Sequence, residues 1–191
     1  KELFINKKNI KNIQIIYLGS IGKGRDSLFI EFIKKINNLE KYVEIDIFGS
    51  ISIKLRNFIF KYQNKYIKIN NYKKINRDEI ILISKNYNLG LQITSDSYPF
   101  ALSTKLYEYP ALCLPQICLC NNGEIKDMIR KNKIGEIINS RSTKDEVSNK
   151  INYAINQIEF EDLYKFAKES TWEFRNKKLI KVIKNLQLYI N

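Results

Sequence analysis

The alternation of short apolar runs with longer amphipathic stretches is the feature that most constrains the fold of this chain. The apolar runs have the length and β-branched content of buried strands, and they cover residues 13–18, 42–48, 66–69, 89–93, 116–119 and 135–138. The stretches between and after them have helical spacing and cover about 26–38, 52–62, 79–85, 103–112, 123–131, 143–158, 161–169 and 172–189. Strands that alternate with helices over short connections favour parallel pairing through right-handed crossovers. The sequence therefore predicts an α/β fold: a Rossmann-like, doubly wound parallel sheet of about six strands with a helical C-terminal tail.

The start of the chain indicates how it is divided. Residues 1–12 are polar and rich in Lys and Asn, which predicts an N-terminal arm or linker, and residues 13–191 form the one expected domain. The first residue is not Met and no signal-peptide core follows, so we expect a domain taken from a longer chain. No run of about 18 apolar residues occurs, so no membrane-spanning helix is predicted.

The charge of the chain is strongly basic, at +13, and comes mainly from Lys. Because Ile and Asn are also abundant, the Lys content is typical of an AT-rich genome and says little about function. The excess is compatible with an anionic ligand, or with peripheral contact at an anionic membrane surface. The lysines are spread along the chain without a basic block interleaved with aromatic residues, so nucleic acid is not expected as a partner.

The histidine and cysteine content excludes several kinds of site. The chain has no His, which excludes most zinc sites and every Ser-His or Cys-His nucleophile in this segment. The odd number of cysteines, Cys113, Cys118 and Cys120, favours a reducing compartment, hence a cytoplasmic location. Cys118 and Cys120 fall on one face of a predicted strand. We interpret them as buried small hydrophobic residues, with a reactive or metal-binding role as the alternative.

A glycine-containing turn, residues 19–25, follows the first predicted strand and opens the first helix. Glycines such as Gly19 let backbone amides approach an anion, and Lys23 and Arg25 add positive charge. The spacing matches neither a Walker A loop nor the dinucleotide fingerprint. The turn is therefore either a diphosphate site or a tight turn that needs glycine.

A second polar segment follows the fourth predicted strand. Ser103 or Thr104 can cap the next helix, and the amides of its first turn could hold a phosphate together with Lys105. Glu108, one turn further along, can accept two hydrogen bonds from a ribose diol. The alternative is a simple helix-surface pair between Lys105 and Glu108.

A third segment, residues 121–124, precedes the next helix. Asn122 is expected to be the N-cap, and Glu124 suits the helix dipole or contacts a sugar. Aromatic residues near the second segment are expected to fill the core or, alternatively, to stack on a base: Tyr98, Phe100, Tyr107 and Tyr109.

Taken in order, these segments resemble the C-terminal domain of retaining glycosyltransferases with two Rossmann domains (GT-B architecture), the glycogen-synthase-like and lipopolysaccharide or capsule group of bacterial polysaccharide biosynthesis. The resemblance covers roughly residues 13–183. The residues that carry it are Gly19, Lys23-Gly24, Lys105-Leu106-Tyr107-Glu108-Tyr109, Ala111-Leu112-Cys113-Leu114-Pro115, Gly123-Glu124 and Trp172-Glu173.

The resemblance implies the donor-binding domain of a hexosyltransferase-like enzyme, incomplete in this chain. Such an enzyme moves a sugar from a nucleotide-diphosphate-sugar to a glycan or lipid-linked acceptor without a metal ion or other cofactor. Its acceptor-binding domain is N-terminal and absent from this chain. The terminal helix crosses to that domain, which would leave apolar residues partly exposed here: Leu179, Ile180, Val182, Ile183, Leu186 and Leu188.

The resemblance also implies a set of site residues. The donor diphosphate would lie against Gly19, Ser20, Lys23, Arg25, Ser103, Thr104 and Lys105. Glu108 would bind the ribose. The donor sugar would lie against Phe100, Ala101 and Leu102, with Glu124 as a further contact.

Four positions depart from the pattern of that group. Ser20 stands where the group has Arg, and Phe100 stands where it has the first of its two glutamates. Ser103 replaces its Pro, and Cys113 replaces its Gly. These departures leave the donor sugar undetermined. They also favour, as the alternative function, a non-catalytic module that binds a nucleotide or phosphate.

Overall fold

The computed structural model describes residues 12–22, 24–37, 39 and 41–187, with side chains described as far as residue 181. Six parallel strands form one sheet in the order β3-β2-β1-β4-β5-β6. Their bounds are β1 Asn12–Leu18, β2 Tyr42–Phe48, β3 Ile67–Tyr72, β4 Leu89–Ile93, β5 Gln116–Leu119 and β6 Gly135–Ile138. The predicted doubly wound parallel sheet is confirmed, because the strand order reverses direction between β1 and β4.

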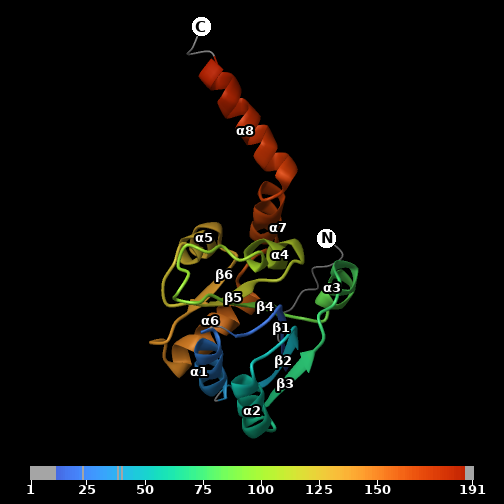
Figure 1. Cartoon of the computed structure of the whole chain (residues 1–191), viewed down its shortest axis with the longest axis vertical. Coiled ribbons are helices and arrows are strands. Elements are labelled where there is room, and N and C mark those ends of the chain that lie inside the picture. The colour runs from blue at the N-terminus through green and yellow to red at the C-terminus, as the bar shows by residue number, and fades with distance from the viewer. Residues whose placement is uncertain (1–11, 23, 38, 40, 188–191) are drawn as a thin grey trace.

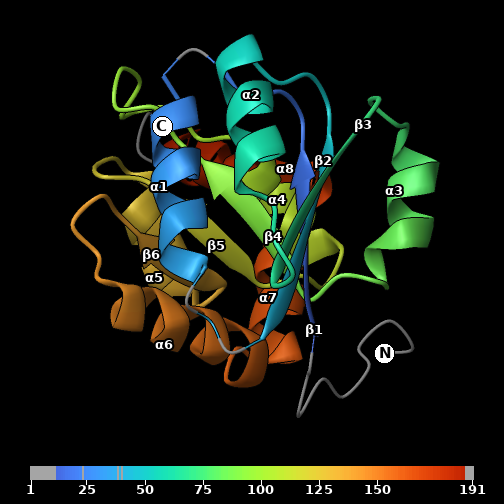
Figure 2. The same cartoon turned by 90° about the horizontal axis from the view of Figure 1, so that it is seen from below.

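Eight helices accompany the sheet in the described part of the chain. Figure 1 shows α4, α5 and α7 on one side of the sheet and α1, α2 and α6 on the other, and Figure 2 shows the same layers from below. Their bounds are α1 Asp26–Ile36, α2 Ile53–Tyr62, α3 Arg77–Ser84, α4 Lys105–Ala111, α5 Ile125–Asn132, α6 Lys144–Asn156, α7 Phe160–Glu169 and α8 Trp172–Gln187. The last helix, α8, projects away from the sheet (Figure 1). No helix among the described residues combines the length and apolarity needed to cross a bilayer.

The core is built by strands that are apolar on both faces, as expected when helices cover both sides of a parallel sheet. Ile13, Ile15 and Tyr17 of β1 point to the face covered by α1, where Phe29 and Phe32 are also buried. The other face of β1 contributes to a smaller apolar cluster: Ile16, Leu18, Phe48, Tyr87, Tyr109 and Leu114.

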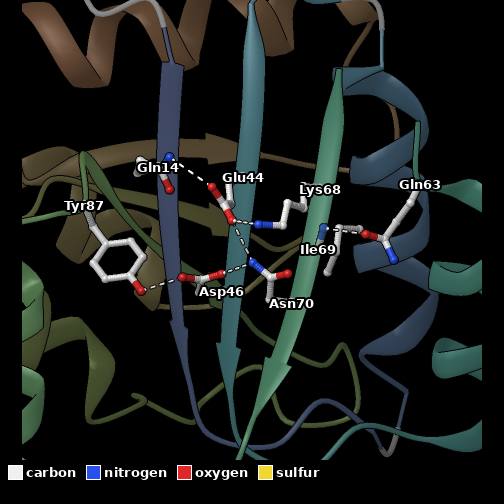
Figure 3. A network of polar contacts seen from close by, with 8 residues as sticks. All are labelled: Gln14, Glu44, Asp46, Gln63, Lys68, Ile69, Asn70 and Tyr87. Carbon is white, nitrogen blue, oxygen red and sulfur yellow. Dashed lines mark hydrogen bonds and ion pairs between the residues drawn. The ribbon is translucent and has the colours of Figure 1, made fainter. Parts of the chain in front are cut away.

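One region of the sheet, over β1, β2 and β3, is polar on the second face (Figure 3). The amide nitrogen of Asn70 donates to Glu44 and to Asp46, each at 2.7 Å, and the Tyr87 hydroxyl donates to Asp46 at 2.7 Å. Lys68 pairs with Glu44 at 2.8 Å, and this contact is the main reason that the pKa of Glu44 lies below its ordinary value. Hydrogen bonds from Asn70, Lys68 and Tyr87 therefore stabilise the neighbouring carboxylates of Glu44 and Asp46.

The end of α4 shows why a non-glycine residue adopts a left-handed conformation at Cys113, where φ is 57°. The Leu114 amide donates to the Tyr109 carbonyl at 2.9 Å, and the Cys113 amide donates to the Pro110 carbonyl at 3.0 Å. This pair of bonds is the Schellman motif, whose C′ position is usually Gly. Cys113 therefore adopts the left-handed conformation of the C′ position although it is not a glycine.

Candidate functional site

The candidate site lies where β1 and β4 neighbour each other in the sheet. The chain leaves β1 toward β2 on one side, and it leaves β4 toward β5 on the other. Ligands of doubly wound sheets bind outside the carboxyl ends of the strands at such a switch point. The loops that follow β1 and β4 are the two segments that the sequence analysis selected.

The turn after β1 is shaped by close backbone approaches. Gly19 has φ of 112°, and its amide donates to the Phe48 carbonyl at 2.9 Å. A Cβ atom on Gly49 would overlap the Gly19 carbonyl, so Gly49 is needed where the two strands end side by side. The Ser20 hydroxyl is exposed and lies 2.7 Å from the Ser50 hydroxyl. Lys23 lies outside the described residues.

Lys105 extends from the start of α4 to this turn. Its Nζ atom would lie 3.3 Å from a Cβ atom placed on Gly19, and it lies 5.3 Å from the ring centroid of Tyr17. Burial lowers the pKa of Lys105, the Glu108 carboxylate raises it, and Arg25 lowers it further. The structure thus places a poorly hydrated ammonium group beside the glycine turn.

Arg25 is the second cation near the turn. Its Nε atom donates to the Gly22 carbonyl at 3.2 Å. Burial raises the pKa of Tyr17, and the nearby Arg25 charge works in the opposite direction. Arg25 thus lies near enough to Tyr17 and Lys105 to influence the pKa of both.

Glu108 and Lys105 line one cavity together with Gly19 and Thr104. The cavity has a volume of about 470 Å³ and continues past Phe48 to the start of α3. A second cavity of about 500 Å³ adjoins it, shares Glu108, and is mostly apolar. The ion pairs of the described residues are Lys68–Glu44 and Lys177–Glu173, so Lys105 and Glu108 are close but not bonded to each other.

The first turn of α4 offers fewer open amides than the sequence suggested. The Lys105 amide donates to the Ser103 hydroxyl at 3.3 Å, and the Leu106 amide donates to the Ser103 carbonyl at 3.0 Å. The Tyr107 amide likewise donates to the Thr104 carbonyl at 3.0 Å. Bonds from residue i to i+3 tighten a helix end and satisfy its donors. Charge in this part of the cavity therefore comes mainly from the Lys105 side chain.

The four residues suggested as sugar contacts lie outside both cavities. Phe100 is 79% exposed, and Ala101, Leu102 and Glu124 are exposed as well. Their loop is anchored by the Glu124 amide, which donates to the Pro99 carbonyl at 3.2 Å. The structure brings this loop to the start of α5, beside the cavities rather than into them.

Two expectations for this region are wrong. Asn122 does not cap α5, because Glu124 occupies the N-cap position with helical dihedral angles and without a side-chain cap. The bond between Glu124 and Pro99 fixes the chain there, so the helix begins at Ile125. Tyr98 and Phe100 do not fill the core, because they are 65% and 79% exposed, whereas Tyr109 is fully buried and does fill it.

Residues at the start of α3 line the cavity and were missed by the sequence analysis. They include Lys74 and Arg77, both exposed. Asn76 caps α3 in a capping box with Glu79, in which each side chain accepts from the backbone amide of the other. That spacing is a helix-start signal, and it would have placed the helix start at Arg77 instead of Glu79.

Pro110 interrupts the hydrogen bonding of α4, and a buried glutamine compensates. Proline cannot donate to the carbonyl four residues earlier, which here belongs to Leu106. The Gln116 side chain of β5 donates to that carbonyl at 3.0 Å, and Gln116 is fully buried. The helix that carries Lys105 and Glu108 is thus tied to the sheet by a side-chain hydrogen bond.

We expect Gln116→Leu to lower the free energy of unfolding by about 1–2 kcal/mol, because it leaves the Leu106 carbonyl buried and unpaired. In a Pro110→Ala background the new amide can bond to Leu106, so the same substitution should cost about 1 kcal/mol less. Denaturant unfolding of the four proteins measures this coupling. Equal costs in the two backgrounds would show that Gln116 does not compensate for the proline.

Comparisons with known proteins support the fold. No family model matches the sequence, and no curated protein matches it. The structure is similar to the lipopolysaccharide outer core galactosyltransferase WaaB, with a TM-score of 0.68 and 12% identity over 93% of this chain and 50% of that chain. It is also similar to the lipopolysaccharide glycosyltransferase WaaG, with a TM-score of 0.58, 16% identity, and coverage of 86% and 44%.

A third similar structure is the C-terminal domain of a group 1 glycosyltransferase, LpcC from Francisella tularensis. The TM-score is 0.56 at 14% identity, over 80% of this chain and 85% of that domain. The present chain therefore spans about half the length of the WaaB chain but most of an isolated C-terminal domain. The predicted resemblance to the C-terminal domain of GT-B glycosyltransferases is confirmed at the level of the fold.

Proposed function

We propose that this domain binds the nucleotide-diphosphate-sugar donor of a glycosyltransferase. The observation that carries the proposal is the convergence of Gly19, Lys105 and Glu108 on one cavity at the switch point of the sheet. The diphosphate lies against the glycine turn and Lys105 on their cavity side, and the pentose lies at Glu108.

The charges near the turn suit a diphosphate leaving group. Breaking the bond to the donor sugar leaves negative charge on the diphosphate, which preorganised cations in a poorly hydrated site stabilise strongly. Lys105 is such a cation, since its lowered pKa reflects burial. Arg25 supplies a second charge beside it. With these two groups the proposal requires no metal ion.

The pentose and base follow the cavity away from the turn. Glu108 offers carboxylate oxygens that accept hydrogen bonds from a ribose diol. Beyond it, the cavity reaches Phe48, whose ring stacks on Tyr72 at 5.0 Å, and then Arg77. We place the base at this end, where Arg77 and Lys74 can contact its polar edge.

The transferase as a whole needs a second domain. Leu179 and Ile180 of α8 are 58% and 51% exposed, which is consistent with a helix that packs on another domain. We propose that an N-terminal domain supplies the acceptor site for a glycan or lipid-linked acceptor. The same proposal includes a cytoplasmic enzyme with peripheral contact at the inner face of the membrane.

A second candidate is a domain that binds the nucleotide without transferring sugar. Ser20 and Phe100 stand where the GT-B group has Arg and Glu, and Phe100 lines neither cavity and is 79% exposed. Activity of the full-length protein with labelled donors distinguishes the two candidates.

The test of donor binding is thermal unfolding of the 191-residue chain with UDP, GDP, ADP and CMP. We expect one diphosphate to stabilise the fold by about 2.7 kcal/mol at 100 times its dissociation constant. Glu108→Gln should weaken its binding about 10-fold, or about 1.4 kcal/mol, because the ribose loses an ionised acceptor. Glu124→Gln, an exposed glutamate outside the cavity, is the matched control and should bind normally. If none of the three nucleoside diphosphates stabilises the protein, the proposal is rejected.

A further inference from the structure

The β1 and β4 strands pair over a short stretch before they separate. Their aligned residues are Ile15 with Leu89 and Ile16 with Gly90. If the ladder continued, Leu18 would lie opposite Gln92, and its amide would donate to the Leu91 carbonyl. These two backbone groups instead meet a side chain.

The Tyr109 hydroxyl is inserted into that missing ladder bond. It accepts from the Leu18 amide at 3.1 Å and donates to the Leu91 carbonyl at 2.7 Å. Tyr109 is fully buried, and burial raises its pKa well above the ordinary value, so the hydroxyl keeps its proton and remains a donor. The Tyr109 side chain therefore replaces a direct hydrogen bond between β1 and β4 at the switch point of the sheet.

The Tyr109 ring has room because position 90 has no side chain. A Cβ atom on Gly90 would lie 2.6 Å from Cδ2 of Tyr109 and closer still to other ring atoms. The ring is thus fixed against the backbone of β4. Both ends of Tyr109 adjoin the proposed site: Glu108 precedes it in the chain, and Gly19 follows Leu18, whose amide donates to its hydroxyl.

We infer that Tyr109 is a positioning residue that sets the distance between the diphosphate turn and the pentose carboxylate. The inference rests on the proposed function. The hydroxyl binds Leu18 directly before the turn, while its own backbone continues the helix that carries Lys105 and Glu108. A nucleoside diphosphate contacts both halves at once, so its affinity depends on their separation. Inorganic pyrophosphate reaches this helix only through the long Lys105 side chain, whose flexible four-carbon stem can absorb a small shift of the helix.

The experiment compares two ligands on the 191-residue chain and its Tyr109→Phe variant. Calorimetric titration uses inorganic pyrophosphate and, among UDP, GDP and ADP, the diphosphate that stabilises the wild type most. We expect the variant to lose about 10-fold in affinity for the nucleoside diphosphate and less than about 3-fold for pyrophosphate. A purely structural role would weaken both ligands alike.

Two further variants serve as controls. Tyr62→Phe removes a hydroxyl from α2, on a ring that stacks on Phe58 away from both cavities, and should bind both ligands as the wild type does. Val147→Ala, in the buried face of α6, lowers stability without touching the site and should also leave the ratio of the two affinities unchanged.

A selective loss of nucleoside diphosphate binding supports the inference, and an equal loss or no loss overturns it. Failure of the wild type to bind any nucleoside diphosphate rejects the proposed function itself, and the inference with it. If Tyr109→Phe does not fold, hydrogen exchange at the Leu18 amide of the wild type replaces it: greater protection with the diphosphate than with pyrophosphate supports the inference, and equal protection overturns it.

Discussion

Gly90→Ala is expected to lower the free energy of unfolding by about 3 kcal/mol, at the upper end of the range for overpacked cores. The new methyl group would overlap the Tyr109 ring, which is fully buried and fixed by its hydroxyl to β1 and β4. Neither partner can move easily, because one is sheet backbone and the other is a large ring. Chemical denaturation with matched m-values measures the loss.

The cause of that loss can be isolated by a second substitution. Tyr109→Leu removes the ring, so Gly90→Ala should cost clearly less in that background than in the wild type. Gly22→Ala is the control, since a Cβ atom there meets no atom within 4 Å. If Gly90→Ala were as stable as the wild type, the close contact between Gly90 of β4 and Tyr109 of α4 would be contradicted.

Lys105→Met should weaken nucleoside diphosphate binding about 100-fold, equivalent to about 2.7 kcal/mol. The substitution keeps the length of the side chain but removes the half-buried charge beside the glycine turn. It should leave stability unchanged or raise it, because burial already disfavours the ammonium form. Opposite effects on binding and stability are typical of functional groups in strained surroundings. Lys74→Met removes an exposed lysine from the same cavity and should weaken binding far less.

The pH dependence of binding gives an independent measure of Lys105. Its folded pKa is lowered, so the free domain loses this proton as the pH rises through a value below the ordinary 10.5. A bound diphosphate favours the charged form, and binding above that pKa should therefore take up a proton and weaken as the pH rises. The unfolded chain binds more protons in the window between the folded and unfolded pKa values, so stability should rise with pH there. Lys105→Met should abolish both dependences, and their persistence would assign them to another group.

The candidate site was only partly predictable from the sequence. Gly19, Lys105 and Glu108 belong to short segments that follow predicted strands, and parallel strands bring their carboxyl ends to one edge. The loop that carries Phe100 also follows such a strand, yet the Glu124 amide holds it by a hydrogen bond to the Pro99 carbonyl, and Phe100 lines neither cavity. No local sequence pattern predicts that hydrogen bond, because it joins the loop after β4 to the loop after β5.

The amino-acid sequence by itself determined the order of strands and helices, since burial of parallel strands and helix faces leaves periodic signals within a few neighbouring residues. Only the tertiary structure decided how Tyr109, Gly90 and Gln116 are used. No periodic signal in the neighbouring residues indicates what these three residues contact. Their roles arise from groups far apart along the chain. Leu18 and Tyr109 are 91 residues apart and meet only when β1 and β4 are placed side by side.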